Sequence, residues 1–253
     1  MSGRLRRSLH AKVDRLSDSA ADVVERVVDA VLLPVDKNAT PGSWLTTTVW
    51  ADAFEARLKA HHALSNEPLA TTNFEAAFNG SCRTAGWSVE PAPSATHRFF
   101  DTTVTLPGAP SRRLSLKSTS ARDLRPGVVH ISKLTEAAWV QDARLHRERR
   151  MRLAALFHEY RQNTDSIVIL RCFKLSTGGL KYELVEIPTS IFEPIEHITV
   201  AQATSDTIEI PAGARPPDLA VRIDRSDAKI TITRLRISLC TVHGWWELKP
   251  QSR

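Results

Sequence analysis

The segment from residue 98 to residue 120, RFFDTTVTLPGAPSRRLSLKSTS, constrains the fold most, because it has the pattern of two strands joined by a turn. The turn, PGAPS, combines proline, glycine and serine as hairpin loops do. Side chains alternate between the faces of a strand, so Ser115 and Lys117 share one face, while the leucines beside them face a core. Closing the hairpin brings Asp101 of the first strand near Lys117. The sequence therefore predicts an acid and a lysine side by side on paired strands.

Composition places the chain among ordinary globular proteins and favours one class of partner. Its 253 residues are 42% hydrophobic and 25% charged, enough for one large domain or a core with a small appendage. The net charge is +6 and the pI is about 9.5. This balance favours a polyanionic partner such as nucleic acid, although many basic proteins bind none.

The cysteines and the hydrophobic segments indicate the cellular compartment of the protein. Cys82, Cys172 and Cys240 are odd in number, far apart and without a CxxC pattern, which indicates a reducing compartment. The basic start is followed by acidic residues, not by an unbroken apolar stretch, so no signal peptide is expected. The sequence contains no run of about 18 apolar residues, so we expect no membrane span. A cytoplasmic protein is the resulting expectation.

Periodicity predicts an α/β fold with a mixed sheet. The expected helices cover residues 11–33, 44–64, 73–83 and 133–162, the last with Ser132 as its N-cap. The expected strands cover 87–90, the hairpin, 166–175, 181–187, and a strand pair at 229–239 and 240–248. From residue 73 to residue 173 the order is helix, three strands, helix and strand. Because a long helix precedes it, the last of these strands should be parallel to a neighbour.

Asp101, a turn and then Ser115-Leu116-Lys117, within this order of elements, resemble the PD-(D/E)XK nucleases, whose best-known small members are type II restriction endonucleases. The resemblance covers about residues 73–175. It implies a restriction-endonuclease-like core of helix, three strands, helix and strand, within a nuclease region of residues 71–253 that ends in a C-terminal β extension. Residues 1–70 would form an N-terminal helical region that serves as a dimer contact or a DNA clamp.

The resemblance also implies a Mg²⁺ site, but with one departure from the family pattern. Ser115 stands where an acid is usual, and a magnesium ion needs further oxygen ligands beside Asp101. Some restriction enzymes with serine there take the second acid from the following helix, which points to Glu136 in ISKLTEAAW. Asp101 and Glu136 are thus the expected metal ligands. The alternative for Glu136 is an acid stabilised near a helix N-terminus by the dipole.

Three further residues complete the expected catalytic set. Glu75 lies on the helix before the hairpin, where the family often has a glutamate that points at the metal; its alternative is a capping box with Thr72 as N-cap. Lys117 would orient the attacking water and stabilise charge at phosphorus, and Ser115 would bond a water of the metal. Without catalysis, Asp101 would be a surface acid and Lys117 an edge lysine that prevents aggregation.

A literal match to the family motif lies elsewhere in the sequence. Pro217-Asp218 precedes Glu247-Leu248-Lys249, which fits the motif better letter by letter. Only residues 250–253 follow, so no helix and strand can complete the fold there. We interpret this match as fortuitous, with Trp245 and Trp246 anchoring the last strand.

Basic side chains offer candidate DNA contacts. Arg144, Arg147 and Arg150 lie in the helical segment RLHRERRMR and could bind phosphates. The alternative is a solvated helix face with an ion pair between Glu148 and Arg152. Candidates for base reading are also spread over the basic strands, namely Arg222, Arg225, Arg234 and Arg236.

The leading hypothesis is a Mg²⁺-dependent type II restriction endonuclease that cuts double-stranded DNA at a short specific sequence and leaves a 5′-phosphate. It would act as a homodimer, since a palindromic site presents two identical half-sites, and a cognate DNA methyltransferase is expected as a separate protein. One alternative is a repair or junction-resolving nuclease on the same core. Another is a DNA-binding protein whose catalytic site has decayed, which Ser115 would support.

Overall fold

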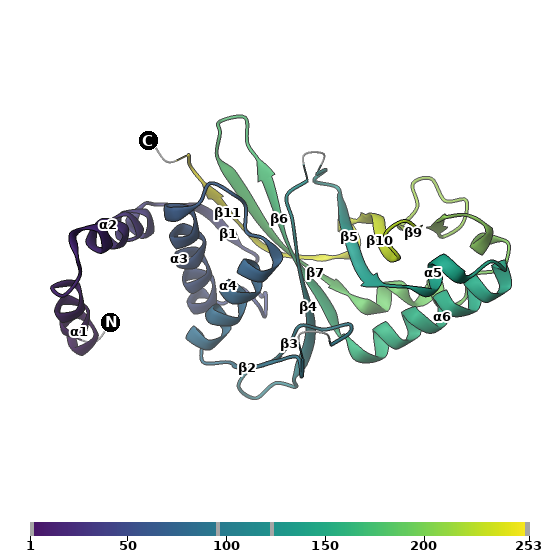
Figure 1. Cartoon of the computed structure of the whole chain (residues 1–253), viewed down its shortest axis with the longest axis horizontal. Helices are drawn as coiled ribbons and strands as arrows, with labels where there is room; N and C mark the ends of the chain where they lie inside the picture. Colours follow the sequence, from purple (N-terminus) through teal and green to yellow (C-terminus); the bar gives the residue numbers. More distant parts are fainter. Residues whose placement is uncertain (1–2, 95–96, 122–123, 251–253) are drawn as a thin grey trace.

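Two β-sheets lie side by side in the computed structural model, which describes residues 3–94, 97–121 and 124–250 (Figure 1). The helices are α1 (Gly3–Val13), α2 (Asp18–Leu32), α3 (Thr48–Leu64), α4 (Thr71–Thr84), α5 (Trp139–Asp142), α6 (His146–Asn163) and α7 (Glu193–Glu196). The strands are β1 (Asp36–Ala39), β2 (Ser88–Pro91), β3 (Thr102–Thr105), β4 (Arg112–Thr119), β5 (Val128–Glu136), β6 (Ser166–Lys174), β7 (Leu180–Pro188), β8 (Thr207–Ile210), β9 (Leu219–Asp224), β10 (Lys229–Arg236) and β11 (Thr241–Leu248). Within these ranges, no helix has both the length and the apolar character to cross a membrane.

The larger sheet is mixed and has seven strands in the order β1-β11-β7-β6-β4-β3-β2. β4 and β6 run parallel, and the other neighbours are antiparallel. The predicted hairpin is confirmed as β3 and β4, and the predicted parallel neighbour of β6 is β4. The chain order in this region is α4, β2, β3, β4, β5, α5, α6 and β6, so the expected helix, three strands, helix and strand form, but β5 and α5 are inserted between β4 and α6.

One face of the larger sheet is covered by α3 and α4 through an aromatic core (Figure 1). Trp50 and Phe54 of α3 stack with ring centroids 4.8 Å apart, and Trp246 of β11 lies 5.1 Å from Phe54. All three rings are buried, and each such ring contributes about 1.5–3 kcal/mol of hydrophobic free energy. Trp246 therefore anchors the last strand as expected, while Trp245 stays partly exposed.

The smaller sheet is antiparallel, in the order β5-β10-β9-β8, and α6 joins it to the larger sheet. Ile131 of β5 and Ile232 of β10 belong to one buried cluster with Phe157 of α6. The same cluster includes Ile167 of β6 and Val185 of β7, on the face of the larger sheet opposite α3 and α4. Because α6 contacts both sheets, it sets the position of the smaller sheet beside β4.

The predicted helix over residues 133–162 is wrong in its first part. Residues Val128–Glu136 form β5, and α6 begins only at His146. Ser132 is no N-cap, since it lies within β5, where its backbone carbonyl accepts a hydrogen bond from Thr231 Oγ at 3.1 Å. The β-branched residues of VVHISKLTE suit a strand once β10, about a hundred residues later, supplies the ladder.

Two smaller expectations also need correction. The helix expected over residues 11–33 is two helices, because the chain leaves the helix at Val13 and starts α2 after Ser17, a residue type favoured at helix N-termini. The two strands expected between residues 229 and 248 form, but they do not pair with each other. β10 belongs to the smaller sheet, whereas β11 lies between β1 and β7.

A buried polar network fastens β7, β11 and the segment before α3. Glu186 of β7 accepts hydrogen bonds from His243 Nε2 at 2.9 Å and from Trp44 Nε1 at 2.8 Å, and His243 Nδ1 lies 2.7 Å from Ser43 Oγ. Burial alone would raise the pKa of Glu186, but hydrogen bonds from His243, Ser166 and Trp44 outweigh it and lower the pKa to about 2.

This network predicts an acid-dependent loss of stability. Because the folded-state pKa of Glu186 lies below its ordinary value of 4.5, the carboxylate stabilises the fold above that value, and this is lost between pH 4.5 and about pH 2. We expect Glu186→Gln to lower the free energy of unfolding by up to about 3 kcal/mol at pH 7 and by little at pH 2. Urea titrations at both pH values measure the difference. An equal difference at the two pH values would contradict the assignment.

Candidate active site

Asp101 lies where β3 separates from β4. The ladder between these strands ends with Thr102 opposite Leu114. One residue further, the Asp101 amide donates to the Leu114 carbonyl at 2.9 Å, and Asp101 Oδ2 accepts a hydrogen bond from the Leu116 amide at 2.6 Å. Beyond this point β3 no longer pairs with β4, and the Asp101 carboxylate accepts a hydrogen bond from the Leu116 amide where a strand carbonyl would otherwise do so. The side chain is thereby held at the open edge of β4, where the two strands separate.

Lys117 and Ser115 meet Asp101 at this edge, as the strand alternation predicts. Lys117 Nζ lies 3.8 Å from Asp101 Oδ2, and both side chains are partly exposed. Ser115 Oγ donates to the same oxygen at 3.2 Å and is 1% exposed. The lysine is therefore accessible to a bound molecule, whereas the serine is buried and holds Asp101.

Glu75 approaches the same place from α4. Burial and the neighbouring Asp101 carboxylate raise the pKa of Glu75, and the Lys117 ammonium opposes them. Within the described part of the chain, Glu75 makes no hydrogen bond or ion pair. The expected capping box is absent, because α4 begins at Thr71 with Ala70 at the N-cap. Glu75 is thus a free, half-buried carboxyl group within electrostatic reach of Asp101 and Lys117.

These residues suit a divalent cation. Mg²⁺ prefers carboxylate oxygens, and two carboxylates that disfavour each other's ionisation are stabilised by a cation between them. All side-chain contacts of Asp101 described above involve Oδ2, and no described residue bonds Oδ1. The described residues contain no group of three or more His, Cys, Asp or Glu side chains that could hold a metal ion. Asp101 and Glu75 therefore fit a cation that takes further ligands from DNA or water.

Glu136 does not join this cluster. The expectation that it lies on a helix is wrong, since it ends β5 on the smaller sheet. Its side chain is exposed and pairs with Lys133 at 2.6 Å, which lowers the pKa of Glu136. Register accounts for this position, because β10 pairs Lys229 with Glu136 and keeps the strand extended to that point.

Of the arginines expected to bind phosphates, Arg144 lies in the connection between α5 and α6, and Arg147 and Arg150 lie in the first turns of α6. Arg144 and Arg147 are exposed, whereas Arg150 donates to the Ile198 carbonyl at 3.0 Å and so has a structural role. Glu148 and Arg152 form the expected pair at 2.8 Å. Arg147 and Tyr160 are separated by about 20 Å along the helix axis, and Tyr160 is the residue of α6 that reaches Ser115.

The second copy of the motif is not assembled. Asp218 pairs with Arg236 of the smaller sheet at 3.0 Å. Glu247 belongs to β11 of the larger sheet, opposite Asp36 on one side and Lys181 on the other. These residues come from different sheets, so Asp218 and Glu247 do not form one site.

Comparison with known proteins identifies the family of the chain. The model of the SmaI family, described as type II site-specific deoxyribonuclease, matches residues 9–248. The chain belongs to this family. The type II restriction enzyme SmaI from Serratia marcescens is 29% identical over 215 residues, which span 78% of each protein. No solved structure is significantly similar to the chain. The protein is therefore a type II site-specific nuclease of a restriction system.

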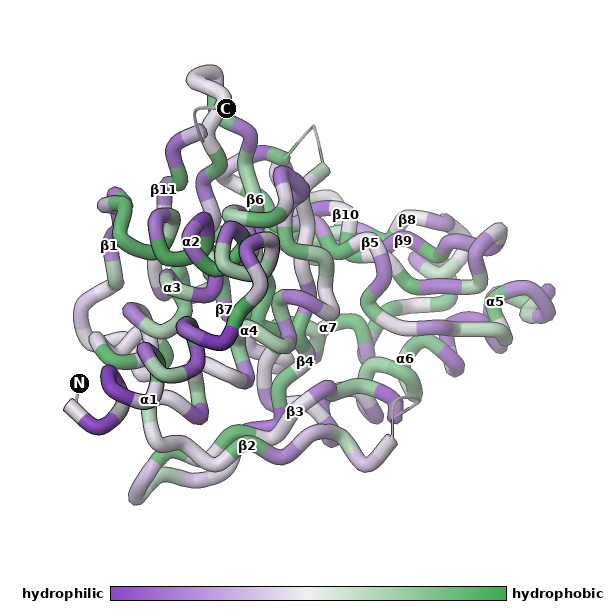
Figure 2. Tube along the Cα trace, turned by 60° about the vertical axis from the view of Figure 1, so that its left-hand side comes forward, coloured by the Kyte–Doolittle hydropathy of each residue, from purple (hydrophilic) through white to green (hydrophobic). Residues whose placement is uncertain are grey.

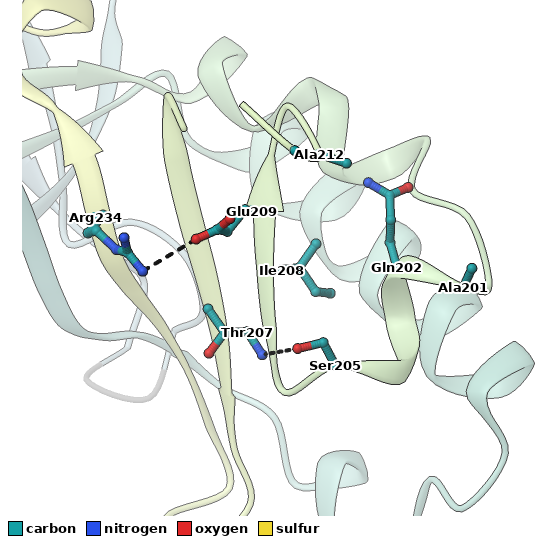
Figure 3. A pocket seen from close by; sticks show the side chains of 9 residues that line it. Ala201, Gln202, Ser205, Thr207, Ile208, Glu209, Ala212 and Arg234 are labelled. Carbon is teal, nitrogen blue, oxygen red and sulfur yellow. Dashed lines mark hydrogen bonds and ion pairs between the residues drawn. The ribbon is translucent and has the colours of Figure 1, made fainter. Parts of the chain in front are cut away.

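A surface hollow on the smaller sheet lies apart from this site. Figure 3 shows side chains around it, among them Gln202 after α7, Glu209 of β8 and Arg234 of β10. Glu209 pairs with Arg234 at 3.4 Å and with Arg215 at 2.8 Å, so Arg234 is already engaged in an ion pair. None of the residues that line the hollow belongs to the Asp101 cluster.

Sequence reasoning missed two residues next to Asp101. Tyr160 of α6 is 1% exposed and lies against Ser115, and Phe99 packs on it with ring centroids 5.4 Å apart. Phe99 has a backbone φ of +81°, a region that costs a residue with a side chain about 1–2 kcal/mol. A signal for Tyr160 was available in its helical spacing from Phe157 and Leu153, although that spacing indicates only a buried face.

Proposed function

We propose that this restriction endonuclease is a Mg²⁺-dependent member of the PD-(D/E)XK superfamily, with a restriction-endonuclease-like core and its catalytic centre at Asp101, Lys117 and Glu75. The observation that carries the proposal is the ion pair between Asp101 and Lys117, at 3.8 Å, on the open edge between β3 and β4. The succession α4, β2, β3 and β4, followed after the inserted β5 and α5 by α6 and β6, with β4 and β6 parallel, supports the core assignment.

The residues of the site have separable roles in phosphodiester hydrolysis. Asp101 and Glu75 would hold the cation, which when bound polarises the scissile phosphate and lowers the pKa of water. Lys117, partly exposed beside Asp101, is suited to orient the attacking water and to stabilise negative charge that develops on the phosphate. Ser115 is buried and donates to Asp101, so it acts on the carboxylate rather than on DNA. As in the family, the products would be a 5′-phosphate and a 3′-hydroxyl.

Substitutions of Glu75 and Glu136 are expected to differ in their effect on the cleavage rate, and this difference identifies the second carboxylate. We expect Glu75→Gln to slow cleavage about 100-fold, because the site loses one of two charges that hold the cation. Glu136→Gln, an equivalent change at an exposed acid paired with Lys133, should change the rate less than threefold. Single-turnover cleavage of cognate DNA over a range of Mg²⁺ concentrations measures both. A defect in Glu136→Gln alone would restore the ligand set expected from the sequence.

The protein's N-terminal helices support a homodimer. Every described side chain of α1 is exposed, and α1 extends away from the two sheets in Figure 1. An isolated helix of this length is marginal in water, so it needs a partner. Exposed apolar side chains line α1, α2 and their connection, at Leu9 (52%), Val13 (38%), Leu16 (38%), Val28 (46%) and Leu32 (76%). Figure 2 shows hydrophobic and hydrophilic residues alternating along α2.

Charge on these two helices is segregated in a way that suits pairing with a second copy. α1 and its connection are mainly basic, with Arg4, Arg6, Arg7, Lys12 and Arg15 against Asp14, whereas α2 is mainly acidic, with Asp18, Asp22, Glu25 and Asp29 against Arg26. A two-fold axis would set α1 of each copy against α2 of the other, and the same contact would be made twice. We therefore assign the dimer contact to α1 and α2 rather than to the whole region of residues 1–70.

Exposed apolar residues of α1 provide a direct test of this contact. We expect Leu9→Ser combined with Val13→Ser to convert a dimer to a monomer, because both side chains lose apolar area that the partner would cover. The matched control is Val200→Ser, an exposed valine (45%) after α7. Light scattering of the purified proteins gives the mass. A monomeric parent protein, or a dimer that survives the double substitution, would contradict the assignment.

Digestion of a plasmid with purified protein and Mg²⁺ separates this function from its alternatives. Discrete fragments support sequence-specific cleavage of double-stranded DNA. Smearing, or cleavage of branched DNA only, would indicate a repair or junction-resolving nuclease, and binding without cleavage in Mg²⁺ or Mn²⁺ would indicate a decayed site. We further infer a separate cognate DNA methyltransferase and a cytoplasmic location, which the free thiols of Cys82, Cys172 and Cys240 suit.

A further inference from the structure

Tyr160 is a buried polar residue that packing alone does not explain. It is 1% exposed, and its hydroxyl has no hydrogen-bond partner of regular geometry among the described residues. The group that it faces is Ser115, and Asp101 is close enough to act on it electrostatically. A phenol keeps its proton near neutral pH, so the hydroxyl can act as a donor. A buried hydroxyl without a bond costs about 1–3 kcal/mol, so phenylalanine would serve packing better.

The backbone conformation of Phe99, close to Asp101, is also energetically unfavourable. Phe99, two residues before Asp101, has a φ of +81° and places its ring edge-on to Tyr160, with centroids 5.4 Å apart. Such conformations persist where the surroundings impose them, and they gather at functional sites. The ring of Tyr160 thus fixes the segment that delivers Asp101, and its hydroxyl points at the serine that bonds Asp101.

We propose that Tyr160 is a positioning residue for DNA cleavage, whose hydroxyl donates to Ser115 Oγ while Ser115 donates to Asp101 Oδ2. This relay, with the Leu116 amide, occupies Oδ2 and leaves Oδ1 to face a cation. We place the hydrogen bond from Tyr160 in the DNA-bound state, because the hydroxyl has no regular partner among the residues that this structure describes. The inference rests on the proposed role of Asp101 as a cation ligand.

The relay also accounts for the serine at a position where an acid is usual. Ser115 is 1% exposed and lies 3.2 Å from Asp101 Oδ2. An ionised carboxylate there could not donate a hydrogen bond to Asp101, whereas a serine hydroxyl can. Serine and tyrosine orient Asp101 without adding charge, which leaves Glu75 as the second acid.

Tyr160→Phe tests the relay, because it removes one oxygen and keeps the ring. We expect the single-turnover cleavage rate to fall about 3- to 10-fold and the Mg²⁺ concentration for half-maximal rate to rise by a similar factor. Calorimetric titration of the DNA complex with Ca²⁺, which reports binding without relying on cleavage, should show the same loss of affinity. Ser115→Ala should behave alike, and Tyr160→Phe should add nothing in the Ser115→Ala background.

The chain's other tyrosine supplies the matched control. Tyr182 of β7 is fully buried, and its hydroxyl bonds His62 Nε2 at 2.7 Å and the Leu69 amide at 3.2 Å, away from Asp101. Tyr182→Phe should lower thermal stability and leave the Mg²⁺ dependence unchanged. Additive effects of Tyr160→Phe and Ser115→Ala, or unchanged cation affinity in Tyr160→Phe, would overturn the relay. Cleavage by Asp101→Asn would instead reject the proposed catalytic centre itself.

Discussion

Replacing Asp101 with asparagine is expected to reduce DNA cleavage at least about 1000-fold. Asparagine keeps an oxygen that can accept the Leu116 amide (2.6 Å) and the Ser115 hydroxyl (3.2 Å), but it removes the negative charge that a cation requires. Lys117→Ala should have a comparable effect of about 100- to 1000-fold, because it removes the exposed ammonium from the edge where the phosphate would bind. Single-turnover cleavage of cognate DNA in Mg²⁺ measures both rates.

The fold and the affinity for DNA should survive these substitutions. Thermal melting and DNA binding in Ca²⁺ check each point separately. Glu247→Ala and Lys249→Ala provide matched controls at the C-terminal segment whose sequence matches the family motif more literally. We expect both variants to cut DNA at the rate of the parent protein. If Glu247→Ala abolishes cleavage while Asp101→Asn does not, the catalytic centre lies at the C-terminal motif and the hairpin site is wrong.

Replacing Arg171 with methionine is expected to destabilise the fold by about 3–5 kcal/mol. Arg171 of β6 is 0% exposed and pairs with Glu183 of β7 at 2.5 Å. Its guanidinium also donates to the carbonyls of Arg125 at 2.6 Å and of Val128 at 3.0 Å, so it fastens the start of β5 to the larger sheet. Methionine fills much of the same volume but leaves a carboxylate and two carbonyls without their donor.

The measurement is the unfolding free energy in urea, with a drop in melting temperature of about 10 °C as the companion readout. Arg152→Met is the matched control, because Arg152 is exposed and its i,i+4 pair with Glu148 contributes at most about 0.5 kcal/mol. Comparable stability of the two variants would mean that Arg171 does not connect the sheets. Loss of cleavage at temperatures where Arg171→Met is folded would further indicate that the position of β5 matters to the catalytic edge.

Local chemistry made the hairpin predictable. The turn residues and the alternation of LSLK are properties of adjacent residues, and strand geometry then dictates that Ser115 and Lys117 share a face. Asp101 could be placed near Lys117 because a short turn leaves few registers, and the structure has Thr102 opposite Leu114. The family resemblance added the chemistry that such a pair performs.

The second carboxylate could not be located in the same way. Glu136 was expected on a helix because Ser132 looked like an N-cap and a helical segment follows it. A ladder with β10 outweighs this signal, and the hydrogen bond from Thr231 to the Ser132 carbonyl spans 99 positions in the sequence. Glu75 had a competing local explanation as a capping residue, and only the packing of α4 against β4 brings it to Asp101.

The sequence by itself determined the hairpin and its polar face, the helix before it, and the parallel strand after a helical crossover. Tertiary structure alone decided that residues 128–136 form a strand, that Glu75 rather than Glu136 lies within electrostatic reach of Asp101, and that Tyr160 lies behind Ser115. The physical reason is the separation in sequence over which each interaction acts. Periodicity and turn chemistry act over a few residues, whereas strand partners, buried hydroxyls and the approach of α4 and α6 to one edge depend on contacts between segments far apart in the chain.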